Sequence, residues 1–176
     1  MNHEPAATAI TKGDHHPGDI IRRYEPSDED AVVGLSLRAW EPVFAALEET
    51  LGRELFNRLR GDWRAGQATE VRDVLADPDK QVWVAEVGRE AVGFVAATLH
   101  RDASLGEIYM IAVEPKVQGH GIGAQLTEVA TQWLQQSGMR VAMVETGGDR
   151  GHAPARRVYD KAGYTALPSV RFFKAL

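Results

Sequence analysis

The chain has 176 residues, 44% hydrophobic and 26% charged, a composition typical of one globular domain rather than of a disordered or fibrous chain. Its formal net charge of −5 disfavours nucleic-acid binding, which more often goes with a basic surface. The absence of cysteine excludes disulfides, thiolate metal sites and a cysteine nucleophile, and fits a reducing cytoplasm. No apolar run approaches the roughly 20 residues that span a bilayer. We expect a cytoplasmic protein that binds no membrane, no nucleic acid and no metal.

The first 19 residues carry neither an apolar signal core nor an Arg-rich amphipathic pattern. We therefore expect a disordered tail over residues 1–19 and a single domain over residues 20–176. Three histidines of the tail could bind a metal, but a solvated tail is the favoured interpretation. These are His3, His15 and His16.

In the first half of the domain the sequence predicts one strand, after which the apolar residues recur at helical spacing. The strand is expected over residues 20–26, where its proline closes it. Helical patterns follow over residues 28–77, with an end or kink expected at Pro42 and breaks near Gly52 and Gly61.

The hydrophobic period changes after Pro78. Strands are expected over residues 81–87 and 91–101, joined by a tight turn into an antiparallel hairpin. Residues 105–113 are nearly all apolar, so we expect a third strand that is buried on both faces. A helix over 121–136, a strand over 139–146, a helix over 152–163 and a closing hairpin of 164–167 with 170–176 follow. This order predicts a mixed α/β fold.

Three glycines, Gly119, Gly121 and Gly123, stand at alternate positions directly before the helix that begins near residue 121. A helix N-terminus presents unpaired backbone N–H groups and a partial positive charge, and glycine allows a ligand to approach the backbone closely. The pattern therefore favours a phosphate or pyrophosphate site over a merely flexible turn.

One candidate ligand is a dinucleotide. Gly119, Gly121 and Ala124 satisfy the G-x-G-x-x-[GA] fingerprint, and Glu145 ends the next strand, where a ribose-binding acid is wanted. However, the residues "EPKVQ" separate the glycines from their strand, and too few βαβ units follow for a Rossmann domain.

The other candidate ligand is coenzyme A. Gln118-x-x-Gly121-x-Gly123 resembles the Q/R-x-x-G-x-G/A signature of the GNAT superfamily of N-acetyltransferases, and "HAPARRVYDKAGY" resembles that family's later N-x-x-A-x-x-x-Y-x-K-x-G-F helix. The positions in register in that helix are Ala155, Tyr159, Lys161 and Gly163. His152 departs from the pattern, because many members have asparagine there. The resemblance implies a GNAT-like α/β fold: a central, mostly antiparallel twisted sheet of roughly six to seven strands, flanked by helices and splayed at the acetyl-CoA site.

The resemblance also implies residue roles. Strand residues near Val113 would contact the pantetheine arm through their backbone and polarise the thioester carbonyl, and the glycine loop would hold the pyrophosphate. Tyr159 would be the general acid, since a tyrosine with an ordinary pKa near 10 keeps its proton at neutral pH. The implied coenzyme contacts are Ile111, Ala112, Val113, Gln118, Gly119, His120, Gly121, Ile122, Gly123, Ala124 and His152.

The general base is left open between two carboxylates. Glu107 lies in the otherwise apolar strand, and Glu145 ends the neighbouring strand. Either could take the amine proton directly or through a water, and either could instead be a plain strand-end residue. Asp149 and His152 follow Glu145 in the same loop and could assist.

The resemblance predicts an acetyl-CoA-dependent N-acetyltransferase that transfers acetyl directly to a primary amine, with a small molecule favoured as the acceptor. The alternatives are a protein N-terminal or lysine acetyltransferase and a non-catalytic acyl-CoA sensor. A homodimer is possible, as dimers are common in the family. The acceptor would be flanked by residues 40–63 and by the loop of residues 168–171. In the first segment, Glu41, Glu48 and Glu49 either attract an amine or form an ordinary solvated face, and the solvated face is the preferred interpretation.

Overall fold

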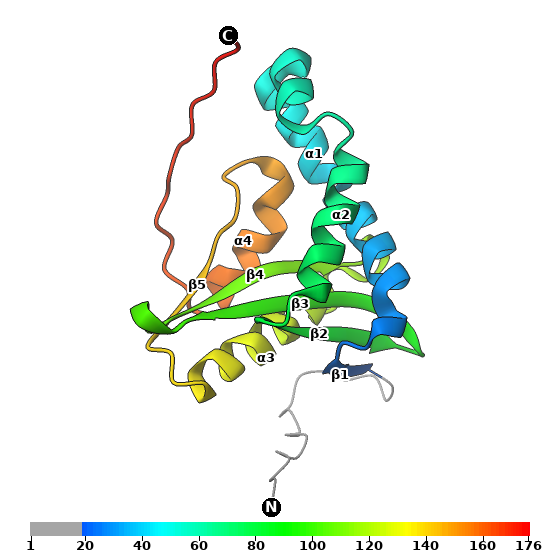
Figure 1. Cartoon of the computed structure of the whole chain (residues 1–176), viewed down its shortest axis with the longest axis vertical. Helices are drawn as coiled ribbons and strands as arrows, with labels where there is room; N and C mark the ends of the chain where they lie inside the picture. The colour runs from blue at the N-terminus through cyan, green and yellow to red at the C-terminus, as the bar shows by residue number, and fades with distance from the viewer. Residues whose placement is uncertain (1–18) are drawn as a thin grey trace, which may run out of the picture.

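The computed structural model describes residues 19–176 (Figure 1). Residues 1–18, which include the three tail histidines and nearly all of the expected tail, lie outside the described residues. The strands are β1 (Asp19–Arg23), β2 (Lys80–Val87), β3 (Glu90–His100), β4 (Leu105–Val113) and β5 (Val141–Val144). The helices are α1 (Glu29–Arg60), α2 (Trp63–Ala76), α3 (Ile122–Gln136) and α4 (Ala153–Lys161), and the 3-10 turns are η1 (Pro26–Asp28), η2 (Arg101–Ala103), η3 (Pro115–Val117) and η4 (Arg150–His152). No helix in this part of the chain is both long and apolar enough to cross a membrane.

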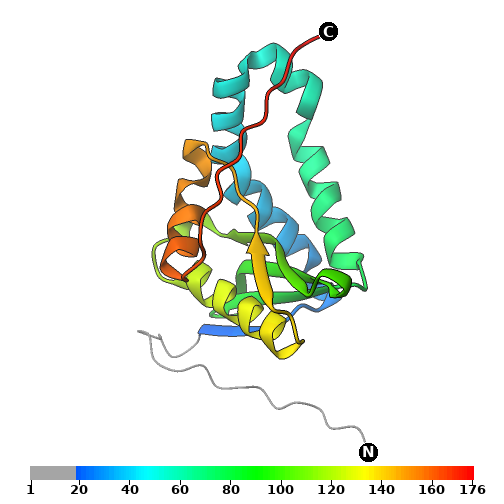
Figure 2. The same cartoon turned by 90° about the vertical axis from the view of Figure 1, so that its left-hand side faces the viewer.

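The strands form one sheet in the order β1-β2-β3-β4-β5. All neighbours are antiparallel except β4 and β5, which are parallel and pair only from Leu105↔Val141 to Ile108↔Val144. A bulge lies between β3 and β4, because Ala96 pairs with Met110 while Ala97 pairs with Ile108, which leaves Tyr109 without a partner. After β5 the chain rises away from the sheet toward α4 (Figure 2). The second half of β4 therefore has a neighbour on one side only, which is the splay that the resemblance implies.

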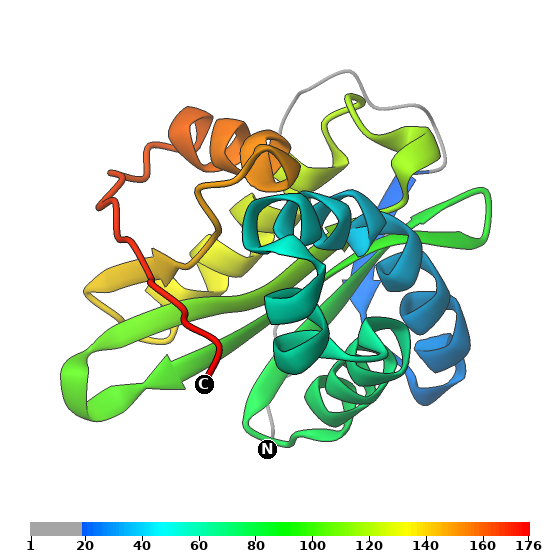
Figure 3. The ribbon, with the colours of Figure 1, turned by 90° about the horizontal axis from the view of Figure 1, so that it is seen from above.

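Helices cover the two faces of the sheet (Figures 1 and 3). Helices α1 and α2 bury one face around Phe94, Leu35 and Val71, all fully buried. Helix α3 buries the other face through Leu126 and Leu134. Seen from above, α1 and α2 do not reach over η2 and β5 (Figure 3). One end of the α1/α2 face is thus open beside β4 and β5.

Several expectations about the elements are wrong. Helix α1 continues through Pro42 rather than ending there, whereas the expected break near Gly52 is present as a bend, where the φ of 75° is left-handed. Strand β4 is not buried on both faces: buried and more accessible side chains alternate along it, and Tyr109 is 44% exposed. The cause is that α1 and α2 stop short of β5, so only one face of β4 is covered along its whole length.

The expected closing hairpin does not form within the described residues. Residues 164–176 contain no strand, so the sheet has five strands rather than six to seven. Alternation alone does not make a strand, because a strand also needs a neighbour for its backbone groups. This segment has no backbone hydrogen bond to β5, and Leu167, Val170 and Phe172 remain largely exposed.

Candidate functional site

The glycine loop joins β4 to α3 and turns on two left-handed glycines. Gly119 and Gly121 have φ of 85° and 86°, which favours glycine over any other residue. The side chains beside them fold back onto the loop: Gln118 Nε2 donates to the Val113 carbonyl at 3.0 Å, and His120 Nδ1 lies 3.1 Å from the Val117 carbonyl. These two side chains are thus engaged with carbonyls at the start of the loop, which leaves the backbone N–H groups after them uncovered by either side chain.

The first turn of α3 presents free backbone donors. The first N–H that bonds back along the helix is that of Gln125, which donates to the Gly121 carbonyl at 3.0 Å. The N–H groups of Ile122, Gly123 and Ala124 have no acceptor among residues 19–176, and the N-cap Gly121 supplies no side chain to cap them. A row of free donors at the positive end of a 15-residue helix fits a phosphate or diphosphate group.

The open edge of β4 adds more backbone groups. Glu114 N–H donates to Val92 on β3 at 2.8 Å, and alternate residues of an antiparallel strand face the same neighbour. Ala112 therefore faces β3, where it pairs with Phe94, whereas the backbone of Ile111 and Val113 is directed away from β3 into the gap left by β5. An extended ligand with amide groups, such as a pantetheine arm, fits that edge.

Tyr159 lies on α4, which packs against α3. It is 7% exposed, and burial, with a smaller contribution from Tyr164, raises its pKa to about 12. No hydrogen bond to its hydroxyl is found among the described residues. Val158, its neighbour on α4, lies beside Gly123, 3.7 Å from where a Cβ at that glycine would stand. Tyr159 is thus a protonated hydroxyl on the helix that borders the free N–H groups.

Glu107 projects from β4 onto the face that α1 and α2 leave open. Its Oε2 lies 2.8 Å from Nε2 of His100, the last residue of β3, and its side chain is 19% exposed. Tyr109 follows at the bulge with the Lys80 Nζ 4.5 Å from its ring centroid. The sequence pattern did not single out His100, because its contact with Glu107 depends on the register between two strands.

Glu145 has a different environment. Its carboxylate pairs with Arg171 at 2.7 Å, and both side chains are about 70% exposed. The partner comes from the segment after α4, so that the pair joins the start of the β5–α4 loop to the C-terminal segment. Glu145 is a solvated ion-pair residue rather than a carboxylate held in a cleft.

Asp149 and His152 hold the β5–α4 loop together. Asp149 accepts hydrogen bonds from the N–H groups of Gly151 and His152, and its Oδ2 lies 2.5 Å from His152 Nδ1. Burial opposes ionisation of Asp149, but the contacts with His152 and the backbone outweigh it, so its pKa lies below the ordinary value. The His152 side chain, at the start of α4, is thus bonded to Asp149 of its own loop through Nδ1.

Arg156 and Gly151 also hold this loop in place, through contacts that local sequence patterns do not reveal. Arg156 NH1 donates to the carbonyls of Gly147 at 2.5 Å and Asp149 at 2.8 Å. A Cβ on Gly151 would lie 2.6 Å from the Cα of Val43, so the loop rests directly on the α1 backbone. Arg156 therefore uses its Nη1 donor to hold two carbonyls of the loop.

Comparison with known proteins decides the family. The model of the Acetyltransferase (GNAT) family matches residues 44–164. The chain belongs to the GNAT acetyltransferase family. This confirms the recognition made from the two motifs and identifies the splayed, mixed α/β sheet as the GNAT fold.

A relative of this GNAT chain is the mycothiol acetyltransferase of Streptomyces bingchenggensis (strain BCW-1), which is 30% identical over 164 residues. The alignment covers 92% of this chain but 47% of the relative, so the chain spans about half the length of the curated relatives it matches.

Solved structures show the same GNAT fold at low identity. The aminoglycoside N-acetyltransferase AAC(6')-Iy in complex with CoA has a TM-score of 0.63 and 17% identity over 95% of this chain and 99% of that chain. The PaiA N-acetyltransferase from Thermoplasma acidophilum in complex with coenzyme A has a TM-score of 0.65 and 15% identity over 87% and 93% of the two chains.

The segment expected to flank the acceptor, residues 40–63, is less acidic than its sequence suggests. Three of its glutamates each pair with an arginine: Glu41 with Arg64, Glu48 with Arg53 and Glu49 with Arg150. Their charge is thus largely neutralised by partners from α1, α2 and η4. The preferred interpretation of an ordinary solvated face agrees with this arrangement.

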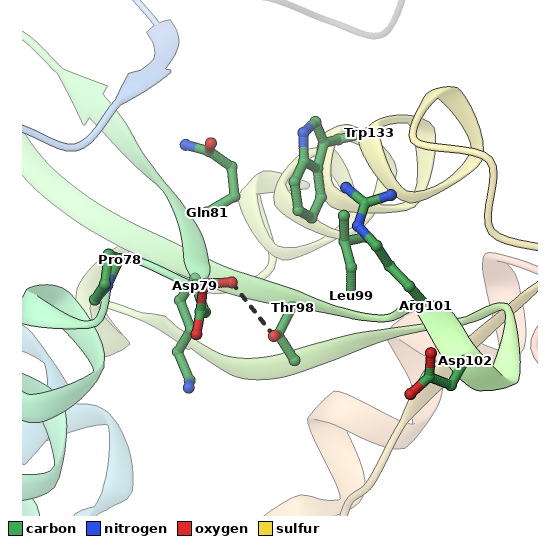
Figure 4. A pocket seen from close by; sticks show the side chains of 9 residues that line it. Pro78, Asp79, Gln81, Thr98, Leu99, Arg101, Asp102 and Trp133 are labelled. Atoms are coloured by element: carbon green, nitrogen blue, oxygen red, sulfur yellow. Dashed lines mark hydrogen bonds between the residues drawn. The ribbon is translucent and has the colours of Figure 1, made fainter.

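One cavity of about 560 Å³ lies elsewhere, at the end of the sheet where β2 starts and β3 ends (Figure 4). Thr98 and Asp79 line it, with a hydrogen bond of 3.4 Å from the Thr98 hydroxyl to the Asp79 carbonyl, and Trp133 closes it from α3. Trp133 is roughly 16 Å along α3 from the first turn, at 1.5 Å per residue. This cavity is therefore separate from the glycine loop.

Proposed function

We propose that the chain is an acetyl-CoA-dependent N-acetyltransferase that transfers acetyl directly to a primary amine of a small molecule, using residues 20–176 as one domain. The observation that carries the proposal is the row of free N–H groups at the start of α3, next to the half of β4 that β5 leaves unpaired. Family membership supports the reaction class.

The backbone provides most of the proposed coenzyme site. The loop from Gln118 to Ala124 would hold the diphosphate through its N–H groups, and the open edge of β4 at Ile111 and Val113 would bind the pantetheine arm. Bound acetyl-CoA supplies an activated acetyl thioester. The N–H of Val113 points into the gap, where it can donate to an oxygen that gains negative charge during acyl transfer.

Tyr159 is the proposed general acid. A pKa of about 12 keeps its hydroxyl protonated at neutral pH, so it can give a proton to the departing sulfur. Its position on α4, the helix that packs against α3 beside the free N–H groups, supports this role. Its aromatic ring also packs near Tyr164, with ring centroids 6.1 Å apart.

Glu107 is the proposed general base, in preference to Glu145. Glu107 is mostly shielded from solvent and stands on β4 just before the bulge and the unpaired half of the strand. Glu145 is exposed, and its carboxylate is engaged by Arg171 outside any cleft. Glu107 would take the amine proton directly or through a water.

The acceptor class is supported by the relatives. Their names specify mycothiol and, among structural neighbours, aminoglycosides, which are small molecules. The chain covers only about half of the mycothiol acetyltransferases, so it need not share their acceptor. We propose a small-molecule amine and leave its identity to experiment.

Thiol release from acetyl-CoA tests the proposal. The panel should contain aminoglycosides, mycothiol-type amines and a peptide with a free N-terminus and a lysine. Release with a small amine is expected. Release with the peptide alone would indicate a protein acetyltransferase, and stabilisation by acetyl-CoA without release for any amine would indicate a sensor. At about 100 times its dissociation constant, acetyl-CoA should stabilise the fold by about 2.7 kcal/mol, whereas NAD(H) should not.

Two matched substitutions test the base. Glu107→Gln should lower kcat by roughly 10²- to 10⁴-fold, the contribution typical of a general base. Glu145→Gln makes the same chemical change at the exposed site and should leave kcat nearly unchanged. The reverse result would reassign the base to Glu145.

A further inference from the structure

We propose that His100 is a positioning residue that holds the carboxylate of Glu107 in its working orientation. The inference rests on the proposed function, because it takes Glu107 as the base. His100 lies in neither family motif, and it is the one hydrogen-bond partner of the Glu107 side chain among residues 19–176.

The sheet register explains how the two side chains meet. Thr98 on β3 pairs with Glu107 on β4, and His100 pairs with Leu105. Residues two apart on a strand share a face, so His100 is the diagonal neighbour of Glu107, a separation that long side chains can bridge. A hydrogen bond of 2.8 Å between His100 Nε2 and Glu107 Oε2 joins these diagonal neighbours.

The direction of the hydrogen bond follows from the chemistry of the partners. An ionised carboxylate only accepts, so the Nε2 of His100 must carry the hydrogen and donate it. This bond fixes Oε2 and leaves Oε1 to accept the amine proton. His100 is 46% exposed and Glu107 is 19% exposed, so the imidazole stands on the solvent side of the carboxylate.

The neighbouring elements offer no substitute for this contact. On β2, Lys80 is held by Asp77 at 2.5 Å and lies over Tyr109. On β5, the residue paired with Glu107 is the uncharged Met143. On α1, Arg38 is held by Glu114 at the other end of β4, and after β5 Glu145 is held by Arg171. The remaining charged groups near His100, Arg101 and Asp102, follow it in η2 and have no hydrogen bond to Glu107 within the described part of the chain.

Without His100 the Glu107 carboxylate would have no hydrogen bond among residues 19–176 to set its orientation. Loss of one hydrogen bond to a charged group costs about 1.5–3 kcal/mol. If that loss falls on the transition state, kcat should drop roughly 10- to 150-fold, since each 1.36 kcal/mol is a factor of ten. Acetyl-CoA binding should not change, because its proposed contacts lie at the other end of β4.

His100→Leu and His100→Gln test the inference together. Leucine removes the donor and should lower kcat by about tenfold or more with an unchanged KM for acetyl-CoA. Glutamine restores an N–H donor and should recover most of the lost kcat. Thr98→Val is the matched control, because Thr98 lies on the same face directly opposite Glu107 but does not bond to it. It should behave as wild type.

A double-mutant cycle separates the possible failures. If His100 acts through Glu107, then His100→Leu should cost nothing further in the Glu107→Gln background. Additive losses, or wild-type kcat in His100→Leu while Glu107→Gln is impaired, would overturn the positioning role and leave the proposed function standing. Full activity in Glu107→Gln would overturn both the assignment of Glu107 as base and this inference. If the wild type released no thiol from acetyl-CoA with any amine of the panel, the proposed function itself would fail, and this inference with it.

Discussion

Gly121→Ala separates the cost of backbone strain from the loss of a ligand contact. Gly121 has a φ of 86°, and a Cβ there would meet nothing within 4 Å. In the free protein the substitution therefore costs only the left-handed conformation, about 1–2 kcal/mol. Reduced freedom of the unfolded chain offsets about 0.4–1 kcal/mol of this. A net loss near 1 kcal/mol should lower Tm by about 2–4 °C in a chain of this size.

Gly138→Ala supplies the matched control at the other end of α3. Its φ is 85°, and a Cβ there would also meet nothing within 4 Å, so the stability cost should be the same. The two positions differ in what they border. A methyl group at Gly121 would stand beside the free N–H groups of Ile122 and Gly123, where we place the diphosphate. Losing one hydrogen bond to a charged group, about 1.5–3 kcal/mol, should weaken acetyl-CoA binding roughly 10- to 150-fold.

The assay is calorimetric titration of acetyl-CoA into both variants, with Tm measured in parallel without ligand. We expect equal Tm losses and a weaker Kd in Gly121→Ala alone. If the two variants bind acetyl-CoA equally well, the amides at the start of α3 do not hold the coenzyme and the proposed site is wrong. Unequal Tm losses would instead show that the strain estimate fails.

Three further predictions concern the acid, an ion pair and the loop. Tyr159→Phe should fold but lower kcat by roughly 10²- to 10⁴-fold. In the wild type, burial raises the pKa of Tyr159 to about 12, so an alkaline titration should show full stability below pH 10 and a loss of unfolding free energy as the pH rises toward about 12. The contact with Arg22 depresses the pKa of Asp28, so its stabilisation is lost as pH falls below the ordinary value of 3.8, and Asp28→Asn should cost about 1–3 kcal/mol by urea unfolding at pH 7. Gly151→Ala should cost about 1–3 kcal/mol by overpacking against the α1 backbone, whereas Gly148→Ala, with open space around it, should be neutral in the same assay.

The sequence predicted the parts of the site that depend on local backbone geometry. Gly119 and Gly121 were detected because left-handed turns and a helix start leave a clear pattern in consecutive residues. The position of Tyr159 on the inner side of α4 follows from the same kind of local spacing. The family recognition rests on these two short patterns, and the fold it implies is confirmed.

Other features depend on contacts between distant segments and could not be predicted. His100 meets Glu107 only because the bulge at Tyr109 sets the register of β3 and β4. The apolar alternation of residues 170–176 predicted a strand, yet no neighbouring backbone pairs with it. The charge of Glu49 is paired with Arg150, which lies about a hundred residues later in the chain, so local sequence could not reveal the pair.

The β5–α4 loop explains why the site is open at all. Strand β5 stops at Val144, and its parallel pairing with β4 stops at Ile108, so the N–H groups of Ile111 and Val113, which face away from β3, have no neighbouring strand among residues 19–176. The chain leaves because the loop is held elsewhere: Arg156 binds two of its carbonyls, and Gly151 rests on α1. The gap for the coenzyme therefore depends on contacts that lie outside the gap.

Arg156→Gln tests that dependence. Arg156 is partly buried and bonds to the carbonyls of Gly147 and Asp149, whereas the adjacent Arg157 is exposed and has no ion pair among residues 19–176. Arg156→Gln should therefore cost about 1–3 kcal/mol of stability and also weaken acetyl-CoA binding, because the loop no longer holds the chain that follows β5 away from β4. Arg157→Gln should change stability by less than about 0.5 kcal/mol, as expected for a surface substitution. Weaker acetyl-CoA binding in Arg156→Gln with an unchanged midpoint of urea unfolding would show that the guanidinium contacts a phosphate instead, and that the loop does not maintain the splay.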